Sequence, residues 1–327
     1  MLLERPTRRR AITMLAASAA AVATGFPFRA RAEYEWRGFA MGSDARILFS
    51  GVSIEDARAA AQMVSAEIER LENALSLFRE QSEICRLNSA GFLATPSGDM
   101  RRSLALALSV AESTGGLFDP TVQALWEAHV DWFTAAPNSD LPPDAVIERA
   151  HTAVDWRRIA LDVDLIKLGP GQRVTLNGLG QGYVTDRVAD LLRQQGFVHV
   201  LVDLGEQRAL GPCVDGAPWL IVRRDAEAIA LTGGALATSE GEGCVLGAAG
   251  AVHHLFDPRT GRSAGHWRRI TVRHRSAALA DALSTALSAA SPAEIEGMAG
   301  KFAGITVWAT DHRGDERRWN SSPSARL

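Results

Sequence analysis

The second half of the chain alternates short apolar runs with segments of helical periodicity, and this alternation limits the possible folds more than any other feature. The runs at residues 174–177, 199–203, 251–256, 270–274 and 304–309 are typical of strands. Helices are expected at 54–77, 100–113, 183–195 and 277–290, and a further one from Asp119-Pro120 to about 132. Strands interleaved with helices predict an α+β fold, a layered α/β sandwich with mixed sheets flanked by helices.

Residues 4–32 have the order of regions that is typical of a secretory signal. An arginine cluster is followed by an apolar run at 11–25 and by the cleavage-site pattern Ala30-Arg31-Ala32. Thr7-Arg8-Arg9 indicates the twin-arginine route, and an ordinary N-terminal helix is the alternative. The run is too short for a permanent membrane anchor. We therefore expect a cleaved signal at 1–32, a periplasmic or exported domain at 33–310, and a frayed polar tail at 311–327.

The charge balance excludes several classes of function. The 327 residues carry a formal charge of −3, and without residues 1–32 the chain has 29 basic against 37 acidic residues. Such a chain is neither a disordered tail nor a basic nucleic-acid binder. Its two lysines, Lys167 and Lys301, leave almost no candidates for Schiff-base or Walker-type chemistry. Cys85, Cys213 and Cys244 lack metal-type spacing, so that one disulfide or three buried thiols are both compatible with them.

A glycine-rich segment, Gly178-x-Gly180-x-Gly182, lies between an expected strand and an expected helix. This order is typical of a backbone that approaches a phosphate at a helix N-terminus. Interpreted as a dinucleotide fingerprint, with Asp203 contacting the ribose, it would indicate a nucleotide-dependent oxidoreductase. The third glycine of that fingerprint falls on Tyr183, however, and a plain tight turn explains the segment equally well.

Two further segments carry groups that are suited to chemistry. Asp281 and Thr285 lie four residues apart on an expected helix, with Ser284 beside them, and oxygen ligands of this kind suit Mg²⁺. The alternative is a packed helix with a few polar residues. His254 follows an expected strand and precedes Asp257, and a histidine in this position could act as a general base. Asp257 before proline is also typical of a routine turn.

Eight ordered blocks of the sequence resemble the FAD:protein FMN transferases, the ApbE family, from about residue 41 to 309. The blocks are Met41-Gly42-Ser43, the run from Leu77 to Ile84 with Arg86-Leu87-Asn88, the run from Gly115 to Val122, the run from Asn177 to Tyr183, Val202-Asp203-Leu204-Gly205, Ala237-Thr238-Ser239, the run from His254 to Gly261, and the run from Ala280 to Leu287. The resemblance implies an ApbE-like fold and a chain that uses FAD as substrate and Mg²⁺ as cofactor. It implies that FMN is transferred to a threonine of a target flavoprotein, with release of AMP.

The resemblance also implies which residues form the site. FAD would be lined by Met41, Phe78, Leu117, Phe118, Asp119, Thr175, Gln181 and Phe256. The metal would be held by the carbonyl of Gly178 and by Asp281, Ser284 and Thr285. Arg259 would supply further countercharge, since phosphoryl transfer depends on charge neutralisation. His254 would receive the threonine proton, with Asp257 as the alternative base or orienting group.

The sequence departs from the family pattern near these groups. The glycine segment usually reads GGIAKGY, whereas here Asn177 replaces a glycine, Gly180 an alanine and Gln181 the lysine. The usual LGGD reads Leu204-Gly205-Glu206-Gln207, and Glu240-Gly241 follows Ser239 where Gly-Asp is usual. An FAD-binding protein with little or no transferase activity is therefore the alternative function.

Overall fold

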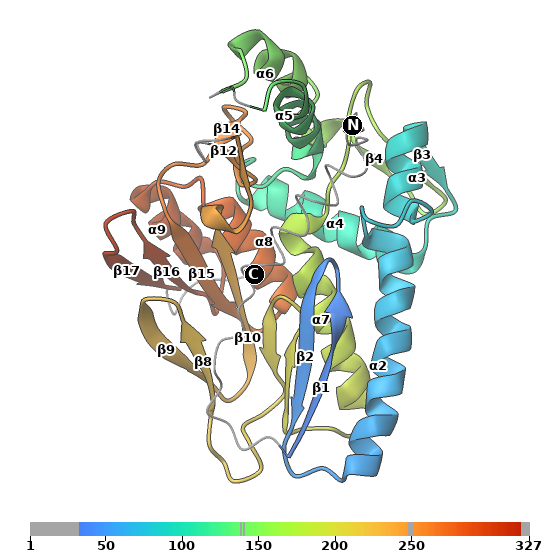
Figure 1. The fold of residues 1–327 in the computed structure, drawn as a ribbon, viewed down its shortest axis with the longest axis vertical. Helices are drawn as coiled ribbons and strands as arrows, with labels where there is room; N and C mark the ends of the chain where they lie inside the picture. The colour runs from blue at the N-terminus through green and yellow to red at the C-terminus, as the bar shows by residue number, and fades with distance from the viewer. Residues whose placement is uncertain (1–32, 138, 140, 248–251, 322–327) are drawn as a thin grey trace, which may run out of the picture.

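The computed structural model describes residues 33–137, 139, 141–247 and 252–321, so the expected signal lies outside the described residues. An eight-stranded sheet forms the centre of the molecule (Figure 1), in the order β1-β2-β6-β7-β10-β15-β16-β17. Its strands are β1 Tyr34–Ala40, β2 Ser43–Phe49, β6 Val200–Asp203, β7 Gln207–Ala209, β10 Gly234–Glu240, β15 Arg269–His274, β16 Thr306–Thr310 and β17 Glu316–Asn320. The pairings between these strands are antiparallel rather than mixed, and the α+β class is confirmed.

Several helices begin where a serine side chain caps the first turn, which satisfies an amide that the helix itself leaves unpaired. Ser53, Ser97 and Ser276 cap α2, α4 and α8 in this way. The helices are α2 Ile54–Leu75, α3 Glu83–Ala90, α4 Gly98–Ser113, α5 Gln123–Ala135, α6 Asp144–His151, α7 Asn177–Gln194, α8 Ala277–Leu287 and α9 Pro292–Lys301. The predicted helices at 54–77, 100–113 and 277–290 are thereby confirmed to within three residues. None of the helices in the described part of the chain has the length and apolar character that crossing a bilayer requires.

Short elements complete the fold. They are the 3-10 helices η1 Pro120–Val122, η2 Trp156–Arg158 and η3 Gly241–Gly243, the small sheet of β3 Phe92–Ala94, β5 Leu165–Lys167 and β4 Ala160–Leu161, and the hairpins β8 Trp219–Arg223 with β9 Ala226–Leu231, β11 Val245–Leu246 with β12 Val252–His253, and β13 Phe256–Asp257 with β14 Arg262–Ser263. The expected strand at 251–256 is thus divided between β12 and β13. Asp119 does cap a helix, but η1 precedes α5.

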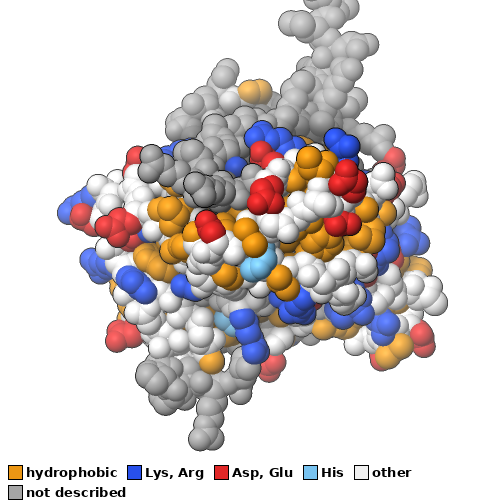
Figure 2. Space-filling view, turned by 90° about the horizontal axis from the view of Figure 1, so that it is seen from below, with side chains coloured by type: hydrophobic (Ala, Val, Ile, Leu, Met, Phe, Trp, Pro, Cys, Tyr) orange, Lys and Arg blue, Asp and Glu red, His pale blue; other side chains and the backbone are white. Residues whose placement is uncertain are grey.

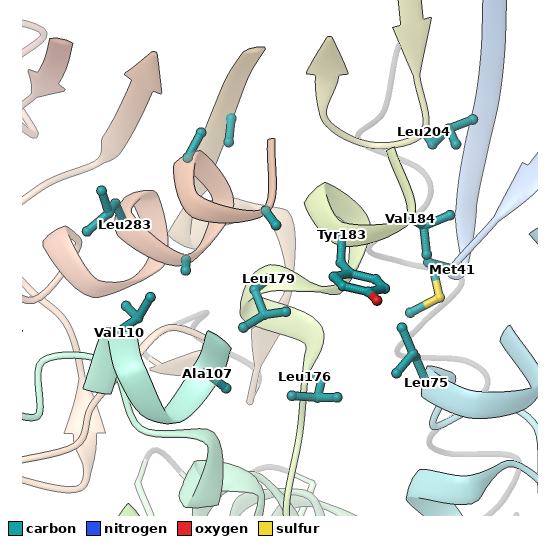
Figure 3. Packing of buried hydrophobic residues seen from close by; sticks show 14 of the residues in the cluster. Met41, Leu75, Ala107, Val110, Leu176, Leu179, Tyr183, Val184, Leu204 and Leu283 are labelled. Atoms are coloured by element: carbon teal, nitrogen blue, oxygen red, sulfur yellow. The ribbon is translucent and has the colours of Figure 1, made fainter. Parts of the chain in front are cut away.

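Two apolar layers flank the main sheet. On one side α7 and α8 pack together, and Leu179 of α7 lies near Ala107 and Val110 of α4 (Figure 3). On the other side Trp219 and Ile229 of the β8–β9 hairpin form a second cluster with apolar side chains of the sheet. Apolar residues of the sheet therefore contribute to clusters on both of its faces. At the end of the molecule opposite α5 and α6, acidic and basic side chains are interspersed with apolar ones (Figure 2).

Three sequence predictions were wrong. The expected strand at 174–177 is not formed, and the glycine segment is not a turn but the first turns of α7. Leu179 and Gly180 already donate backbone hydrogen bonds to the carbonyl of Leu176, and packing against α8 compensates for the low helix propensity of glycine. The expected frayed tail contains β17, which pairs with β16 and places Trp319 against Trp267 at 6.0 Å. Residues 322–327 lie outside the described residues.

Among the described residues, the three cysteines form no disulfide with one another. Cys213 and Cys244 are buried, and burial raises the pKa of both thiols. A raised pKa disfavours the reactive thiolate, which is consistent with a packing role for these two side chains. The sequence allowed either one disulfide or three buried thiols, and the structure therefore favours thiols.

Candidate active site

The site is built on a close contact between α7 and α8. A Cβ atom at Gly182 would lie 2.4 Å from the carbonyl oxygen of Ala277, so only glycine permits this approach. The contact lets the Gly182 amide donate a hydrogen bond to Asp281 Oδ2 at 2.9 Å. The glycine segment therefore serves helix packing, and through it positions the carboxylate of Asp281.

The oxygen atoms predicted to hold a metal lie together in the structure. Thr285 Oγ1 donates to the carbonyl of Gly178 at 3.3 Å, and Ser284 Oγ donates to the carbonyl of Asp281 at 3.0 Å. Ser239 of β10 joins them, because its Oγ lies 2.8 Å from Ser284 Oγ and 3.4 Å from Thr285 Oγ1. Sequence reasoning did not single out Ser239, although it lies within one of the family blocks. The four predicted ligands thus come from two facing helices.

Burial dominates the electrostatics of Asp281. The side chain is 4% exposed, and desolvation raises its pKa to about 7, while the Gly182 amide lowers it and the Asp186 carboxylate raises it further. Its Oδ1 receives no hydrogen bond from a described residue. Asp186 is itself occupied at the start of α8, where it accepts from Ser276 Oγ and from the amides of Ala277 and Ala278.

The donor set fits Mg²⁺, which usually takes one or two carboxylates together with substrate phosphates and waters. The described residues hold no group of three or more His, Cys, Asp or Glu side chains that could bind a metal. Here a single carboxylate oxygen without a hydrogen-bond partner lies beside a backbone carbonyl and hydroxyls. Such a site would need oxygens from a ligand to complete an octahedral shell.

A second group of predicted residues gathers at the turn between β1 and β2. Met41 has a φ of 50°, and its amide donates to Glu72 Oε1 at 2.7 Å. The Phe78 ring lies against Gly42, where a Cβ would come within 2.8 Å of it, and 47% of Phe78 remains exposed. A half-exposed aromatic ring held against backbone is suited to stacking on a planar ligand.

Gln181 connects this turn to α7. Its Nε2 donates to Ser43 Oγ at 2.9 Å, and its amide packs against Gly205. Met41 lies near Gly180, where a Cβ would be 3.2 Å from Met41 Cε. Met41, Phe78 and Gln181 therefore border the same part of α7 that carries Gly178.

The floor of the candidate FAD site, beside the first turn of α7, is formed by four of the predicted residues: Leu117, Phe118, Asp119 and Thr175. Leu117 and Phe118 are buried, and the Phe118 ring would be 3.1 Å from a Cβ at Gly178. Thr175 donates its amide to the carbonyl of Pro120 at 2.8 Å. Both carboxylate oxygens of Asp119 are taken up by the fold, since they accept from Thr121 and from the amide of Trp156. Asp119 therefore holds the floor in place.

The hairpin that follows β12 carries the candidate base. Burial lowers the pKa of His254 to about 4, although the Cys244 carbonyl, 3.3 Å from Nδ1, opposes this. His254 is consequently neutral at pH 7, and a pKa lowered this far makes its imidazole a weak base there. His253 is engaged instead with the fold, because its Nε2 lies 2.8 Å from the Ala264 carbonyl and its ring packs on Gly241.

The remaining predicted residues of this hairpin have structural partners. Asp257 accepts from the amide, Nε and Nη2 of Arg259, so it orients this arginine and is not positioned as a free base. Arg259 also donates to Glu294 at 2.6 Å, and two carboxylates neutralise the countercharge expected of it. Phe256 lies 4.7 Å from the His129 ring in a cluster beside α5. Phe256 therefore belongs to a different apolar cluster from Met41.

The dinucleotide interpretation is wrong. Asp203 accepts from Arg46 Nε at 3.0 Å and from Gln207, so it is not available for a ribose. Tyr183, at the position of the third glycine, points toward α4 and donates to Asp99 Oδ1 at 2.7 Å. The glycine segment packs two helices together, and the fold has no parallel sheet beneath it among the described strands.

Comparison with known proteins agrees with this geometry. The chain belongs to the ApbE family, whose model matches residues 41–308. This match confirms the resemblance seen in the sequence.

Three curated relatives are named FAD:protein FMN transferase, and the share of their length that this chain covers differs. The FAD:protein FMN transferase of Escherichia coli K12 is 24% identical over 88% of this chain and 86% of its own length. The Salmonella typhimurium protein of the same name is 27% identical over 70% of each. For Treponema pallidum the identity is 28%, and the chain spans about half of that protein.

Solved structures confirm the fold. The ApbE protein of Thermotoga maritima superposes with a TM-score of 0.77 at 27% identity, covering 87% of this chain and 96% of that one. The flavin transferase ApbE of Vibrio cholerae gives a TM-score of 0.73 at 23% identity, covering 90% and 98%. The predicted α+β fold of the ApbE type is therefore confirmed.

Proposed function

We propose that this protein is an exported, Mg²⁺-dependent FAD:protein FMN transferase that attaches FMN through a phosphoester bond to a threonine of a target flavoprotein. The observation that carries the proposal is the cluster of Gly178, Asp281, Ser284 and Thr285, next to the exposed Phe78 ring, in a chain of the ApbE family. Phosphoryl transfer needs countercharge and positioning more than covalent machinery; this cluster would position a Mg²⁺ ion, and the ion would supply the countercharge.

FAD is the substrate of the proposed reaction. The planar ring of the flavin or the adenine would stack on Phe78, with Met41 and Gln181 at the border. The pyrophosphate of FAD would lie at the start of α7, where the helix dipole favours anions. Leu117 and Phe118 would exclude water from beneath it.

The metal would be held by the Asp281 carboxylate, the Thr285 and Ser284 hydroxyls and the Gly178 carbonyl. Bound there, Mg²⁺ would neutralise the charge that develops on the pyrophosphate oxygens. The chain itself holds the oxygens in place, because the Gly182 amide fixes Asp281 and Ser239 fixes the two hydroxyls.

The bond changes of the proposed reaction balance without a further reactant. The acceptor threonine oxygen forms a bond to the phosphorus of the FMN half, and the bond from that phosphorus to the bridging oxygen breaks. AMP leaves with the bridging oxygen, and the threonine proton passes to neutral His254. Asp257 and Arg259 hold the hairpin that carries this histidine.

A second candidate function is FAD binding without efficient transfer. The observation that favours it is Gln181, whose neutral amide is bonded to Ser43 and adds no positive charge beside the phosphates. This alternative predicts a yellow protein with bound FAD and no covalent product.

Incubation with FAD, Mg²⁺ and a purified acceptor domain distinguishes the two functions. The transferase predicts an acceptor whose mass rises by one FMN less one water, together with free AMP, and predicts that Asp281→Asn abolishes both. FAD retention without either product favours the alternative. Export is tested separately, since it rests on residues 1–32: periplasmic recovery of a chain that begins near residue 33 supports it.

A further inference from the structure

Glu206 is a buried carboxylate for which the proposed function has no use. It lies in the tight turn between β6 and β7, after Gly205 with its φ of 102°, and only 5% of it is exposed. Two contacts hold it: Thr185 Oγ1 donates to the Glu206 carbonyl at 3.2 Å, and the Thr238 amide donates to Glu206 Oε2 at 3.1 Å. One hydrogen bond therefore holds the backbone of Glu206 and the other holds its carboxylate.

Both contacts come from the immediate neighbours of the Asp281 site. Thr238 precedes Ser239, whose hydroxyl lies 2.8 Å from Ser284 Oγ. Thr185 lies one turn beyond Gly182, whose amide binds Asp281. These hydrogen bonds place Glu206 and Asp281 against the same segments of α7 and β10. Burial first, and then the charge of Asp281, raises the pKa of Glu206 well above its usual value.

No cation compensates this pair among the described residues. Each carboxylate receives a single hydrogen bond, from a backbone amide, and Glu206 Oε1 and Asp281 Oδ1 receive none from a described residue. The other charged group that acts on Glu206 is a third carboxylate, Asp203. Buried carboxyls of this kind are ionised when they coordinate a metal and otherwise take up a proton.

We propose that Glu206 supplies a second carboxylate to the divalent cation held at Asp281, so that the site binds this cation before FAD arrives. The inference rests on the proposed function in one respect, namely that Asp281 holds the metal. With two carboxylates the protein itself supplies enough negative charge to bind the cation. With only one carboxylate, the pyrophosphate would have to supply the remaining negative charge. The order of binding would then be metal first, FAD second.

The experiment titrates the full mature chain with Mn²⁺ in the absence of FAD and follows free Mn²⁺ by electron paramagnetic resonance. The natural chain should bind one Mn²⁺, and Mg²⁺ should compete. Glu206→Gln keeps an oxygen for the Thr238 amide, so the fold is retained while the charge is lost. Its affinity for Mn²⁺ should fall at least about tenfold, the lower bound for losing a group that supports a metal site. The exposed Glu227→Gln is the matched control and should bind normally.

A metal-free melting curve separates ligation from a structural role. Glu206→Gln should melt no lower than the natural chain without metal, and should lose the rise in melting temperature that Mg²⁺ produces. If this variant does not fold, Glu206→Ala is measured in the same way. If Glu206→Gln binds Mn²⁺ as tightly as the natural chain does, the inference is overturned.

The outcome also distinguishes this inference from the proposed function. If Asp281→Asn loses Mn²⁺ and Glu206→Gln does not, the inference is overturned and the proposed metal site is supported. If both variants lose Mn²⁺ while the natural chain makes no covalent FMN product, the inference is supported and the proposed transfer is overturned. A natural chain that binds no Mn²⁺ without FAD overturns the inference.

Discussion

Replacement of Gly182 by alanine tests whether the α7–α8 contact positions the site. The added Cβ would lie 2.4 Å from the Ala277 carbonyl oxygen and 2.8 Å from the Ala278 Cα. Both are backbone atoms, which cannot rotate away, so the helices must separate by about 1 Å to restore normal contact distances. This separation would pull the residue 182 amide away from Asp281 Oδ2.

The expected magnitude follows from two opposing effects. Overpacking a buried contact costs up to about 3 kcal/mol, and the upper end applies because the main chain has to move. Alanine returns about 1 kcal/mol through its higher helix propensity. The net loss of unfolding free energy is about 2 kcal/mol, which corresponds to a fall in melting temperature of about 4–8 °C.

Two alanine substitutions at other glycines serve as controls in the same thermal and denaturant melts. Gly180→Ala, one half-turn earlier, meets only the flexible end of Met41 at 3.2 Å and should leave stability unchanged or slightly raised. Gly297→Ala in α9 has no atom within 4 Å and should stabilise by about 0.5–1 kcal/mol. A Gly182→Ala variant as stable as Gly180→Ala, with unaltered Mn²⁺ binding, would refute the reasoning.

Three further predictions concern the site and the fold. His254→Ala should lower the rate of FMN transfer by about 10²–10⁴-fold while FAD binding, measured by flavin fluorescence, is retained. Phe78→Ala should weaken FAD binding by about 1 kcal/mol in the same titration, whereas Phe78→Tyr should not. Asp99→Asn should cost about 2 kcal/mol at pH 7 in urea melts, because it removes charged hydrogen bonds from Arg70 and Arg102.

The Asp99 effect has a defined pH dependence. Burial alone would raise the pKa of Asp99, but hydrogen bonds from Tyr183, Arg70 and Arg102 outweigh burial and hold it well below its usual value. A depressed pKa means that the unfolded chain takes up the proton first, so the stabilisation is present above about pH 4 and is lost as the pH falls further. The stability difference between Asp99→Asn and the natural chain should therefore shrink below pH 4; a constant difference would contradict this account.

The sequence predicted the elements whose signals are local. The apolar periodicity of α2, α4 and α8 and the serines before them located these helices closely. The start of α7 was missed because three glycines and an asparagine indicate a turn, and only contact with α8 makes them helical. β17 was missed because Arg317 and Arg318 look like a solvated tail, whereas pairing to β16 forms the strand.

The candidate site shows the same division. The i, i+4 spacing of Asp281 and Thr285 and the order of the family blocks selected the predicted metal ligands, and the structure brings Thr285 within 3.3 Å of the Gly178 carbonyl. Ser239 and Glu206 could not be assigned from spacing, because they reach the site from β10 and from the β6–β7 turn through sheet register. Asp257 and Arg259 looked like free chemical groups, and only the structure reveals that they neutralise each other.

Covalent flavin on an acceptor protein tests the central claim most directly. The chain, the acceptor domain, FAD and Mg²⁺ are incubated together, and the intact acceptor is measured by mass spectrometry. The account predicts a mass gain of one FMN less one water on a threonine, in step with AMP release, and neither with Asp281→Asn. An acceptor of unchanged mass beside an FAD-loaded natural chain would contradict it.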